Sequence, residues 1–468
     1  MNLPEKQIYK QPENITKRTA LFVATFAAFL TPFMGSALNV ALPSIGKDFN
    51  ADAISINWIA SAYILATAIF LLPFGRIGDI AGRKKIFTYG ILLFTFSSLL
   101  CGLSPNTGLL ITFRVLQGIS SAMIFGTSVA ILTSVFPPGE RGKALGINVA
   151  SVYAGLSAGP TLGGLLTQYF TWRSIFFVMV PLGLITLWIT VSRLKGEWSD
   201  AKGEKFDIPG MILYGLGLSS IMYGFSEFPG WTGYVFILSG LLIIAAFGWY
   251  ELHTEQPLFE IRLLSRSRVF AFSNLAALIH YSATFGIGFM LSLYLQYIKD
   301  FEPREAGFIL VVQPVIMAVF SPLTGRLSDK IQPRIFASVG MIFSSIGLFM
   351  LSFINNNTSL ITLLLILVLL GIGYALFSSP NINAIMSSVE RKYYGIASGT
   401  VGTMRMVGQM LSMGVALMLF SLFLGKVEIR PEYFGDFMRA MKVSFIIFTV
   451  LCIGGVFASL ARGKIKNN

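Results

Sequence analysis

The chain has 468 residues, of which 54% are hydrophobic and only 12% carry a charged side chain. An average soluble domain has about 25% charged residues, so this chain has too few to cover a water-exposed surface. The composition excludes an ordinary soluble protein and predicts an all-α polytopic membrane protein, since the alternating segments of membrane β-barrels are absent. The sequence has two cysteines in apolar runs and two histidines, so we expect no metal and no cofactor.

Fourteen apolar runs follow one another along the chain, and each is long enough to cross a bilayer as a helix. In chain order the predicted spans are 19–41, 54–74, 85–103, 108–135, 142–168, 173–193, 208–227, 232–250, 269–297, 305–325, 334–354, 359–387, 394–425 and 440–461. The polar breaks between them are too short for a soluble domain, so any function must lie within the membrane.

The basic residues are distributed unevenly over these breaks. If the N-terminus is cytoplasmic, 25 of the 35 lysines and arginines lie in cytoplasmic segments, eight lie in outer loops, and Arg114 and Arg405 lie within spans. This bias follows the positive-inside rule and predicts a multi-pass protein of the cell (cytoplasmic) membrane with both termini cytoplasmic. The net charge of +13 is thus explained by topology, and we expect no nucleic-acid partner.

The two halves of the chain share short motifs at nearly the same separation. GRIGD (Gly75–Asp79) returns as GRLSD (Gly325–Asp329), and Gly155 corresponds to Gly408. We interpret the halves as copies of one six-helix unit, as in many secondary transporters; a chance match of glycine-rich helices is the alternative. The predicted parts are an N-terminal six-helix bundle (1–193), two inserted spans with flanking cytoplasmic loops (194–268) and a C-terminal six-helix bundle (269–468).

Five motifs occur in a fixed order along the chain. They are LNVALPSI (Leu38–Ile45), GRIGDIAGRKK (Gly75–Lys85), RVLQGISSA (Arg114–Ala122), GLSAGPTLGG (Gly155–Gly164) and LYLQ (Leu293–Gln296). Together they resemble the major facilitator superfamily, specifically its fourteen-span drug:proton antiporter branch, over almost the whole chain. The resemblance implies two six-helix bundles with two inserted central spans. It also implies proton-coupled efflux of small amphipathic compounds by alternating access.

The loop between spans 2 and 3 places an acid before a helix N-terminus, where negative charge is favoured. The resemblance implies that Asp79 and Arg83 form a charge relay that latches the two halves in the outward-facing state. Ile80 departs from the family, which usually has a basic residue there. The positive-inside rule alone is the alternative interpretation; it explains the basic residues of the loop but not the spacing of its glycines. The candidate residues of this gating loop and of its second-half copy are Gly75, Asp79, Gly82, Arg83, Gly325, Arg326 and Asp329.

A stripe of glycines runs along span 5, formed by Gly155, Gly159, Gly163 and Gly164, with Pro160 among them. Missing side chains allow helix backbones to approach closely, and the proline favours a bend. Pure helix packing is one interpretation. The resemblance implies that this packing also seals an antiporter against leak.

Arg114 lies about two turns into span 4, with Gln117 one turn further on. A charge inside the bilayer costs free energy, so an intramembrane arginine is a functional candidate. Snorkelling to the outer interface is the alternative. The resemblance implies that this arginine faces the central cavity and takes part in proton coupling, although Met34 occupies the place where the family usually has an Asp in span 1.

Arg405 lies near mid-depth in span 13, and no acid lies in the middle of any predicted span. We therefore expect a positive cavity that disfavours permanently cationic compounds; a structural bond to span-end carbonyls is the alternative for Arg405. His280, in the middle of span 9, is a candidate carrier of the coupled proton because its reference pKa is near neutral, or else a hydrogen-bonded structural residue. The polar residues expected around the cavity are Gln117, Asn148, Gln313, Asn381, Asn383 and Gln409.

We conclude from the sequence that the chain is a secondary active transporter and not an enzyme. Its expected partners are a small-molecule substrate, protons and the lipid bilayer, and we expect a monomer. A lipid or organic-anion carrier on the same fold, without proton coupling, is the alternative within transport. A non-transporting membrane receptor is a further alternative, which would show neither uptake nor efflux of any compound.

Overall fold

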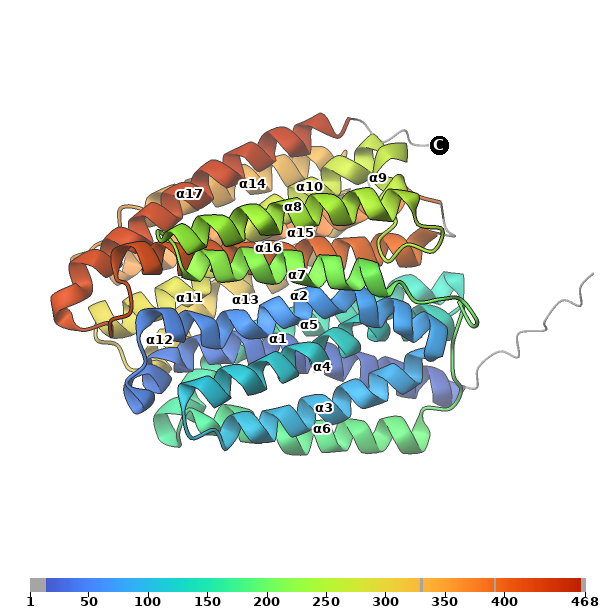
Figure 1. Cartoon of the computed structure of the whole chain (residues 1–468), viewed down its shortest axis with the longest axis horizontal. Coiled ribbons are helices and arrows are strands. Elements are labelled where there is room, and N and C mark those ends of the chain that lie inside the picture. Colours follow the sequence, from blue (N-terminus) through green and yellow to red (C-terminus); the bar gives the residue numbers. More distant parts are fainter. Residues whose placement is uncertain (1–13, 329–330, 391–392, 464–468) are drawn as a thin grey trace, which may run out of the picture.

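The computed structural model describes residues 14–328, 331–390 and 393–463, which form long helices running side by side (Figure 1). In this part of the chain, fourteen helical segments are long and apolar enough to cross a membrane. They match the predicted spans one for one, so the all-α polytopic class is confirmed. The first described helix begins and the last one ends at the same end of the molecule. We call this end the termini end and the opposite one the far end.

Polar side chains at the breaks cap two of the first six helices, the second and the fourth. Asp52 Oδ1 accepts a hydrogen bond from Ser55 N (2.7 Å), and Asn106 Oδ1 accepts one from Leu109 N (2.9 Å). Each bond satisfies a helix N–H group that lacks an intrahelical partner. These six helices are α1 (Asn14–Phe49), α2 (Ala53–Ala81), α3 (Arg83–Gly102), α4 (Thr107–Val135), α5 (Pro138–Tyr169) and α6 (Arg173–Arg193).

The second half of the chain contains two spans that are interrupted. The span Arg268–Ile298 is broken at Phe285, and the span Pro303–Ser328 is broken at Val311. The segments are α9 (Arg262–Arg266), α10 (Arg268–Thr284), α11 (Gly286–Leu293), the π-helix η1 (Tyr294–Ile298), α12 (Pro303–Leu310), α13 (Val312–Ser328), α14 (Pro333–Leu351), α15 (Leu360–Ser387), α16 (Tyr394–Phe423), the 3-10 turn η3 (Pro431–Tyr433) and α17 (Phe434–Ala461). We call α1–α6 the first bundle and α10–α17 the second bundle.

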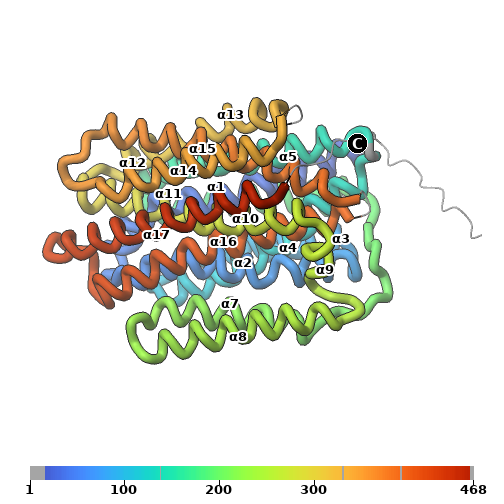
Figure 2. The backbone as a smooth tube through the Cα atoms, turned by 90° about the horizontal axis from the view of Figure 1, so that it is seen from above, coloured from blue at the N-terminus to red at the C-terminus, as the bar shows by residue number. Residues whose placement is uncertain are grey.

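Helices α7 (Ile208–Ser226) and α8 (Trp231–His253) form a hairpin on one flank (Figure 2). Helix α7 contacts α2 of the first bundle and α16 of the second, whereas α8 packs chiefly against α7. Glycines allow this close packing, since a Cβ added at Gly240 would lie 2.9 Å from the carbonyl oxygen of Gly217. Most of α8 faces outward, and Trp249 is 66% exposed.

Equivalent helices of the two bundles pack in equivalent ways. Gly118 of α4 lies against the α2 backbone, and its counterpart Gly371 of α15 lies against α13. Gly155 of α5 lies against the α1 backbone, and its counterpart Gly408 of α16 lies against α10. Matching sequence positions thus make matching helix contacts, which supports duplication of one unit over chance similarity.

Candidate functional site

The far end joins the two bundles through the first and last of the five sequence motifs. Ser292 Oγ donates a hydrogen bond to Asn39 O (2.6 Å), and Gln296 Nε2 donates one to Val40 O (2.9 Å). Each of these buried donors therefore has a backbone acceptor in the other bundle, as buried polar groups generally require. The motifs LNVALPSI and LYLQ therefore meet as one interface at the far end.

Tyr153 of α5 and Ser378 of α15 join the bundles near mid-depth through a hydrogen bond of 2.9 Å. Toward the termini end, a Cβ added at Gly146 of α5 or at Gly399 of α16 would meet no atom within 4 Å. Among the described residues, the hydrogen bonds that join the two bundles lie in the far half of the molecule and at mid-depth.

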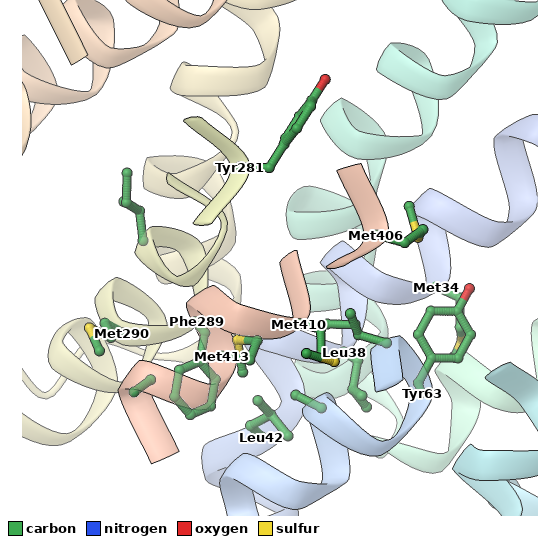
Figure 3. Close-up of a cluster of buried hydrophobic side chains, with 14 of the residues drawn as sticks. Met34, Leu38, Leu42, Tyr63, Tyr281, Phe289, Met290, Met406, Met410 and Met413 are labelled. Atoms are coloured by element: carbon green, nitrogen blue, oxygen red, sulfur yellow. The ribbon is translucent and has the colours of Figure 1, made fainter. Parts of the chain in front are cut away.

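Sulfur-containing and apolar side chains of α1, α2 and α16 belong to one buried cluster. Met34 lies beside the Tyr63 ring, and Met406 and Met410 of α16 lie nearby, the latter close to Leu38 (Figure 3). Met34 is completely buried, so the position where the family usually has an acid is occupied by a buried apolar side chain. Methionine is unbranched and polarisable, and it adapts to partners of different shape.

Arg114 points into the first bundle and is 1% exposed. Its Nε donates a hydrogen bond to Ile59 O (3.2 Å), its Nη1 donates one to Gln117 Oε1, and its guanidinium lies over the Tyr63 ring. Gln117 in turn donates to Ser98 Oγ (2.8 Å). The side chain therefore does not snorkel to the outer interface, and it pairs with Gln117 inside the first bundle.

Arg405 is partly exposed and lies on the side of α16 that faces the first bundle. Its guanidinium carbon is 5.9 Å from the centroid of the Phe125 ring of α4. Tyr63, Tyr153 and Tyr374 lie close enough to interact with its charge. No carboxylate or other hydrogen-bond acceptor among the described residues pairs with it. Arg405 thus presents an uncompensated charge among phenol rings contributed by both bundles.

His280 of α10 is completely buried in an aromatic cluster. Its ring stacks on Phe377 with centroids 4.0 Å apart, and Tyr374 lies 5.0 Å away. Neither ring nitrogen has a hydrogen-bond partner among the described residues. A buried polar group without a partner costs about 1–3 kcal/mol, so the alternative of a hydrogen-bonded structural histidine has no contact to support it.

The polar residues expected around the cavity do not gather at one place. Asn381 belongs to a buried network near the termini end, where its Nδ2 donates to Ser273 O (3.1 Å) and its Oδ1 accepts from Arg462 Nη1 (3.0 Å). Asn383 Nδ2 donates to a serine at the end of α13 (3.0 Å). Gln409 is half-buried on α16, one turn beyond Arg405. Arg462 was missed as a site residue because its sequence context is that of an ordinary positive tail.

The glycine stripe of α5 faces two helices. A Cβ at Gly155 or Gly159 would collide with the α1 backbone or with Ser36, and one at Gly163 would lie 2.7 Å from Ala37 Cα. A Cβ at Gly164 would lie 2.5 Å from the carbonyl oxygen at the start of α12, in the second bundle, and Pro160 meets the same helix at Gly307. The predicted close approach of backbones is present, and it includes a contact between the bundles.

The segment of residues 75–85, which the sequence predicts as a loop, is helical except at Gly82, because α2 continues to Ala81 and α3 begins at Arg83. We keep the name loop 2–3 for this segment, which is held by charged contacts. Arg83 Nη2 pairs with Asp79 Oδ1 (2.6 Å), and its Nη1 donates a hydrogen bond to Ser134 Oγ (2.6 Å). Gly75 lies beside Gly126 of α4, and Gly82 has a φ of +117°. In the second-half copy, Gly325 lies against Ser379 and Arg326 is exposed, while Asp329 lies outside the described residues. The predicted Asp79–Arg83 pair is formed within one loop.

Comparison with known proteins places the chain in a family. It matches the model of the Major Facilitator Superfamily over residues 24–413 and again over 273–464. It is 30% identical over 448 residues to the riboflavin transporter RibZ of Clostridioides difficile (strain 630), covering 95% of this chain and 97% of that protein. It is 31% identical over 458 residues to the cephamycin export protein CmcT of Amycolatopsis lactamdurans, with 96% and 94% covered.

A solved structure shares the fold. It is a bacterial homologue of the human lysosomal transporter Spinster in an inward-facing and unoccupied conformation, with a TM-score of 0.68, 17% identity, and 96% of this chain and 98% of that chain covered. The helices, their apolar surfaces and the family match lead to one conclusion. The chain belongs to the major facilitator superfamily of membrane transporters.

Proposed function

We propose that this transporter exports small amphipathic compounds that are neutral or anionic, in exchange for protons, by alternating access. The observation that carries the substrate class is Arg405, a partly exposed guanidinium between the bundles with no described counter-ion. Relatives named for riboflavin transport and for cephamycin export support a small organic substrate.

The physical argument rests on the charge of the site. A cation that approached Arg405 would meet a like charge in a region of low dielectric, where the repulsion far exceeds its value in water. An anion would instead gain charge-assisted hydrogen bonds from a planar fork of donors. The phenol rings and methionines nearby offer apolar and aromatic contact to the rest of such a molecule.

The proposed orientation places both termini in the cytoplasm of a cell whose cytoplasmic membrane holds the protein as a monomer. The bias of lysines and arginines toward the termini-end loops supports it. With this orientation the far end is the outer end, and the contacts at Asn39, Val40 and Tyr153 close the outer half. The structure then corresponds to an inward-facing state.

Reporter fusions test this orientation without a substrate. Fusions after Lys202 and Asn468 are expected to report a cytoplasmic location, and one at Asn356 an external one. An external reading at Asn468 would overturn the orientation.

The transport proposal is tested with inside-out vesicles, an imposed pH gradient and dyes of matched size but opposite charge. Wild type is expected to accumulate the anionic dye. Arg405→Gln is expected to lower its rate about 10- to 100-fold, the equivalent of lost hydrogen bonds to a charged group. Arg266→Gln, at an exposed arginine of the α8–α10 connection, is the matched control. Equal transport of cationic dyes by wild type and Arg405→Gln would refute the charge argument.

An organic-anion carrier without proton coupling is the second candidate. The uncompensated Arg405 favours it, because this arginine serves anion binding whether or not a proton moves. The two candidates differ in one result of the same assay. Collapsing the pH gradient with an ionophore abolishes concentrative transport by an exchanger and leaves simple anion movement intact.

A further inference from the structure

The segment of residues 194–207, which joins α6 to α7, lies along loop 2–3, and we call it the strap. Backbone hydrogen bonds connect the two: Arg83 N donates to Trp198 O (2.9 Å), and Ala201 N donates to Asp79 O (3.0 Å). A polar connection between spans has no need of such pairing to link two helices. The strap is therefore fitted to this loop.

Glu197 of the strap supplies the missing cap of α3. Gly82, at the N-cap position, has no side chain, and the Glu197 carboxylate accepts hydrogen bonds from Lys84 N (2.8 Å) and Lys85 N (3.2 Å). Negative charge is favoured at a helix N-terminus. A Cβ at Gly82 would lie 2.6 Å from Glu197 Cδ, and the residue has a φ of +117°. Glycine is thus required here both for the backbone conformation and for the carboxylate.

Two further acids of the strap pair with the two arginines of GRIGDIAGR. Asp200 Oδ2 lies 2.7 Å from Arg83 Nη2, the same nitrogen that pairs with Asp79. Glu204 pairs with Arg76. Arg83 therefore has one carboxylate partner in its own loop and a second in the strap.

The strap is anchored at its other end to the inserted hairpin. Asp207 Oδ1 accepts hydrogen bonds from Gly210 N (2.9 Å) in α7 and from Tyr250 Oη (3.2 Å) in α8. Lys205 N donates to Gln256 Oε1 (2.9 Å) beyond α8. Movement of the hairpin relative to the first bundle would thus pull directly on loop 2–3.

The hairpin contacts both bundles. Tyr214 Oη donates a hydrogen bond to Ala68 O in α2 (3.3 Å), and Ser421 Oγ of α16 donates one to Ser226 O at the end of α7 (2.9 Å). Because α7 rests on one helix of each bundle, a change in the relative position of the bundles must shift the hairpin on at least one of them.

We infer that the strap clasps loop 2–3 and stabilises the conformation described here, and that its release accompanies closure of the termini end. Glu197 and Asp200 are the positioning residues of this clasp. The inference rests on alternating access as proposed above. A loop whose helix N-terminus and Arg83 are occupied by the strap is not free to dock on the second bundle, and losing Asp200 leaves Arg83 with Asp79 alone.

The test measures a distance and needs no substrate. Spin labels are placed at Lys143 of α5 and Ile396 of α16, exposed positions near the termini end of each bundle, with Cys101 and Cys452 replaced by alanine. Glu197→Gln and Asp200→Asn are expected to shift the ratio of long to short distances about fivefold toward the short one, the size of one charge-assisted contact at a partly exposed site. Glu255→Gln, at an exposed acid outside the strap, is the matched control.

A second test exchanges the charges of the Glu204–Arg76 pair and asks whether the wild-type distances return. Glu204→Arg is expected to shift the distances in the same direction, and adding Arg76→Glu is expected to restore them. Distances that stay at the wild-type ratio in Glu197→Gln and Asp200→Asn, with normal amounts of inserted protein, would overturn the inference. The side chain of Asp200 is 68% exposed, so its substitution leaves folding unaffected. Failure of the dye assay together with shifted distances would refute the exporter and leave the clasp standing.

Discussion

The guanidinium carbon of Arg114 lies 4.2 Å from the centroid of the Tyr63 ring, and the Tyr63 hydroxyl is hydrogen-bonded to Ser121 Oγ at 2.8 Å. A buried charge is normally neutralised by an opposite charge. Here the guanidinium is instead surrounded by neutral groups, which are a ring face, the Ile59 carbonyl and the Gln117 amide. The arginine therefore ties α4 to α2 through contacts that depend on the shape of a guanidinium.

Replacing Arg114 with lysine keeps the charge but removes the planar fork of donors. We expect Arg114→Lys to lower the free energy of unfolding by about 1–3 kcal/mol, because the Ile59 carbonyl and the Gln117 amide lose a partner. Anionic dye transport is expected to weaken without a reversal of charge preference. Thermal unfolding in detergent measures the first effect, with Arg266→Lys as the control. An unchanged melting temperature would show that only the charge matters.

Replacing Met34 with aspartate restores the acid that the family resemblance leads one to expect. The new carboxylate would lie beside Tyr63, whose ring also contacts the guanidinium of Arg114. We expect Met34→Asp to gain transport of cationic dyes, while Met34→Asn, of similar shape but neutral, does not. If both variants behave alike, charge at this position does not decide selectivity.

The glycine stripe predicts a contrast between two alanines on one helix. Gly163→Ala would force a methyl group to 2.7 Å from Ala37 Cα, whereas Gly146→Ala meets open space. Overpacking costs about 1–3 kcal/mol, while alanine in an open helical position stabilises by up to about 1 kcal/mol. The melting temperature is thus expected to fall for the first variant and to hold or rise for the second. Equal effects would contradict the packing described here.

His280 is the candidate proton carrier, and the chain provides its own control. His253, the other histidine, lies exposed at the end of α8, where its Nδ1 contacts Trp249 O. We expect His280→Gln to remove the dependence of transport on the imposed pH gradient while dye binding persists, and His253→Gln to keep that dependence. Gradient-driven transport by His280→Gln at the wild-type rate would exclude this residue as the carrier.

Arg462, just beyond α17, is the buried cation that sequence inspection did not single out. Burial lowers its pKa to about 10. Because this lies below the unfolded value, the unfolded chain binds more protons between the two, so this residue makes stability rise with pH only above about 10. At pH 7 we expect Arg462→Gln to destabilise by about 2–3 kcal/mol, since Asn381 and Ser273 lose a charged donor. A melting temperature equal to that of Arg326→Gln would contradict this.

The spans and the glycine stripe were predictable because both follow from local pattern. An apolar run of sufficient length has no stable alternative to a helix in lipid, and glycines spaced along one face permit close packing whatever the partner. These predictions needed no knowledge of which helices meet.

Contacts between distant segments were not predictable in the same way. Asn381 and Gln409 look alike in sequence, but one is in a buried network with Arg462 and the other lies half-buried beside Arg405. In sequence, the strap is indistinguishable from any polar connection between two spans, because the spacing of its acidic residues matches neither a helix nor a strand period. Its partners in loop 2–3 lie more than a hundred residues away, and only the fold brings them together.

The outward position of α8 has a consequence for sequence variation. Only four of its 23 residues are buried, so most side chains there face lipid and not protein. In a saturation library scored by transport, α8 is expected to accept any apolar residue at most positions and to reject only charge. The exceptions are the buried positions of α8, which are Gly233, Gly240, Phe247 and Glu251. The substitutions tolerated at each position of this helix would therefore show which of its residues face lipid.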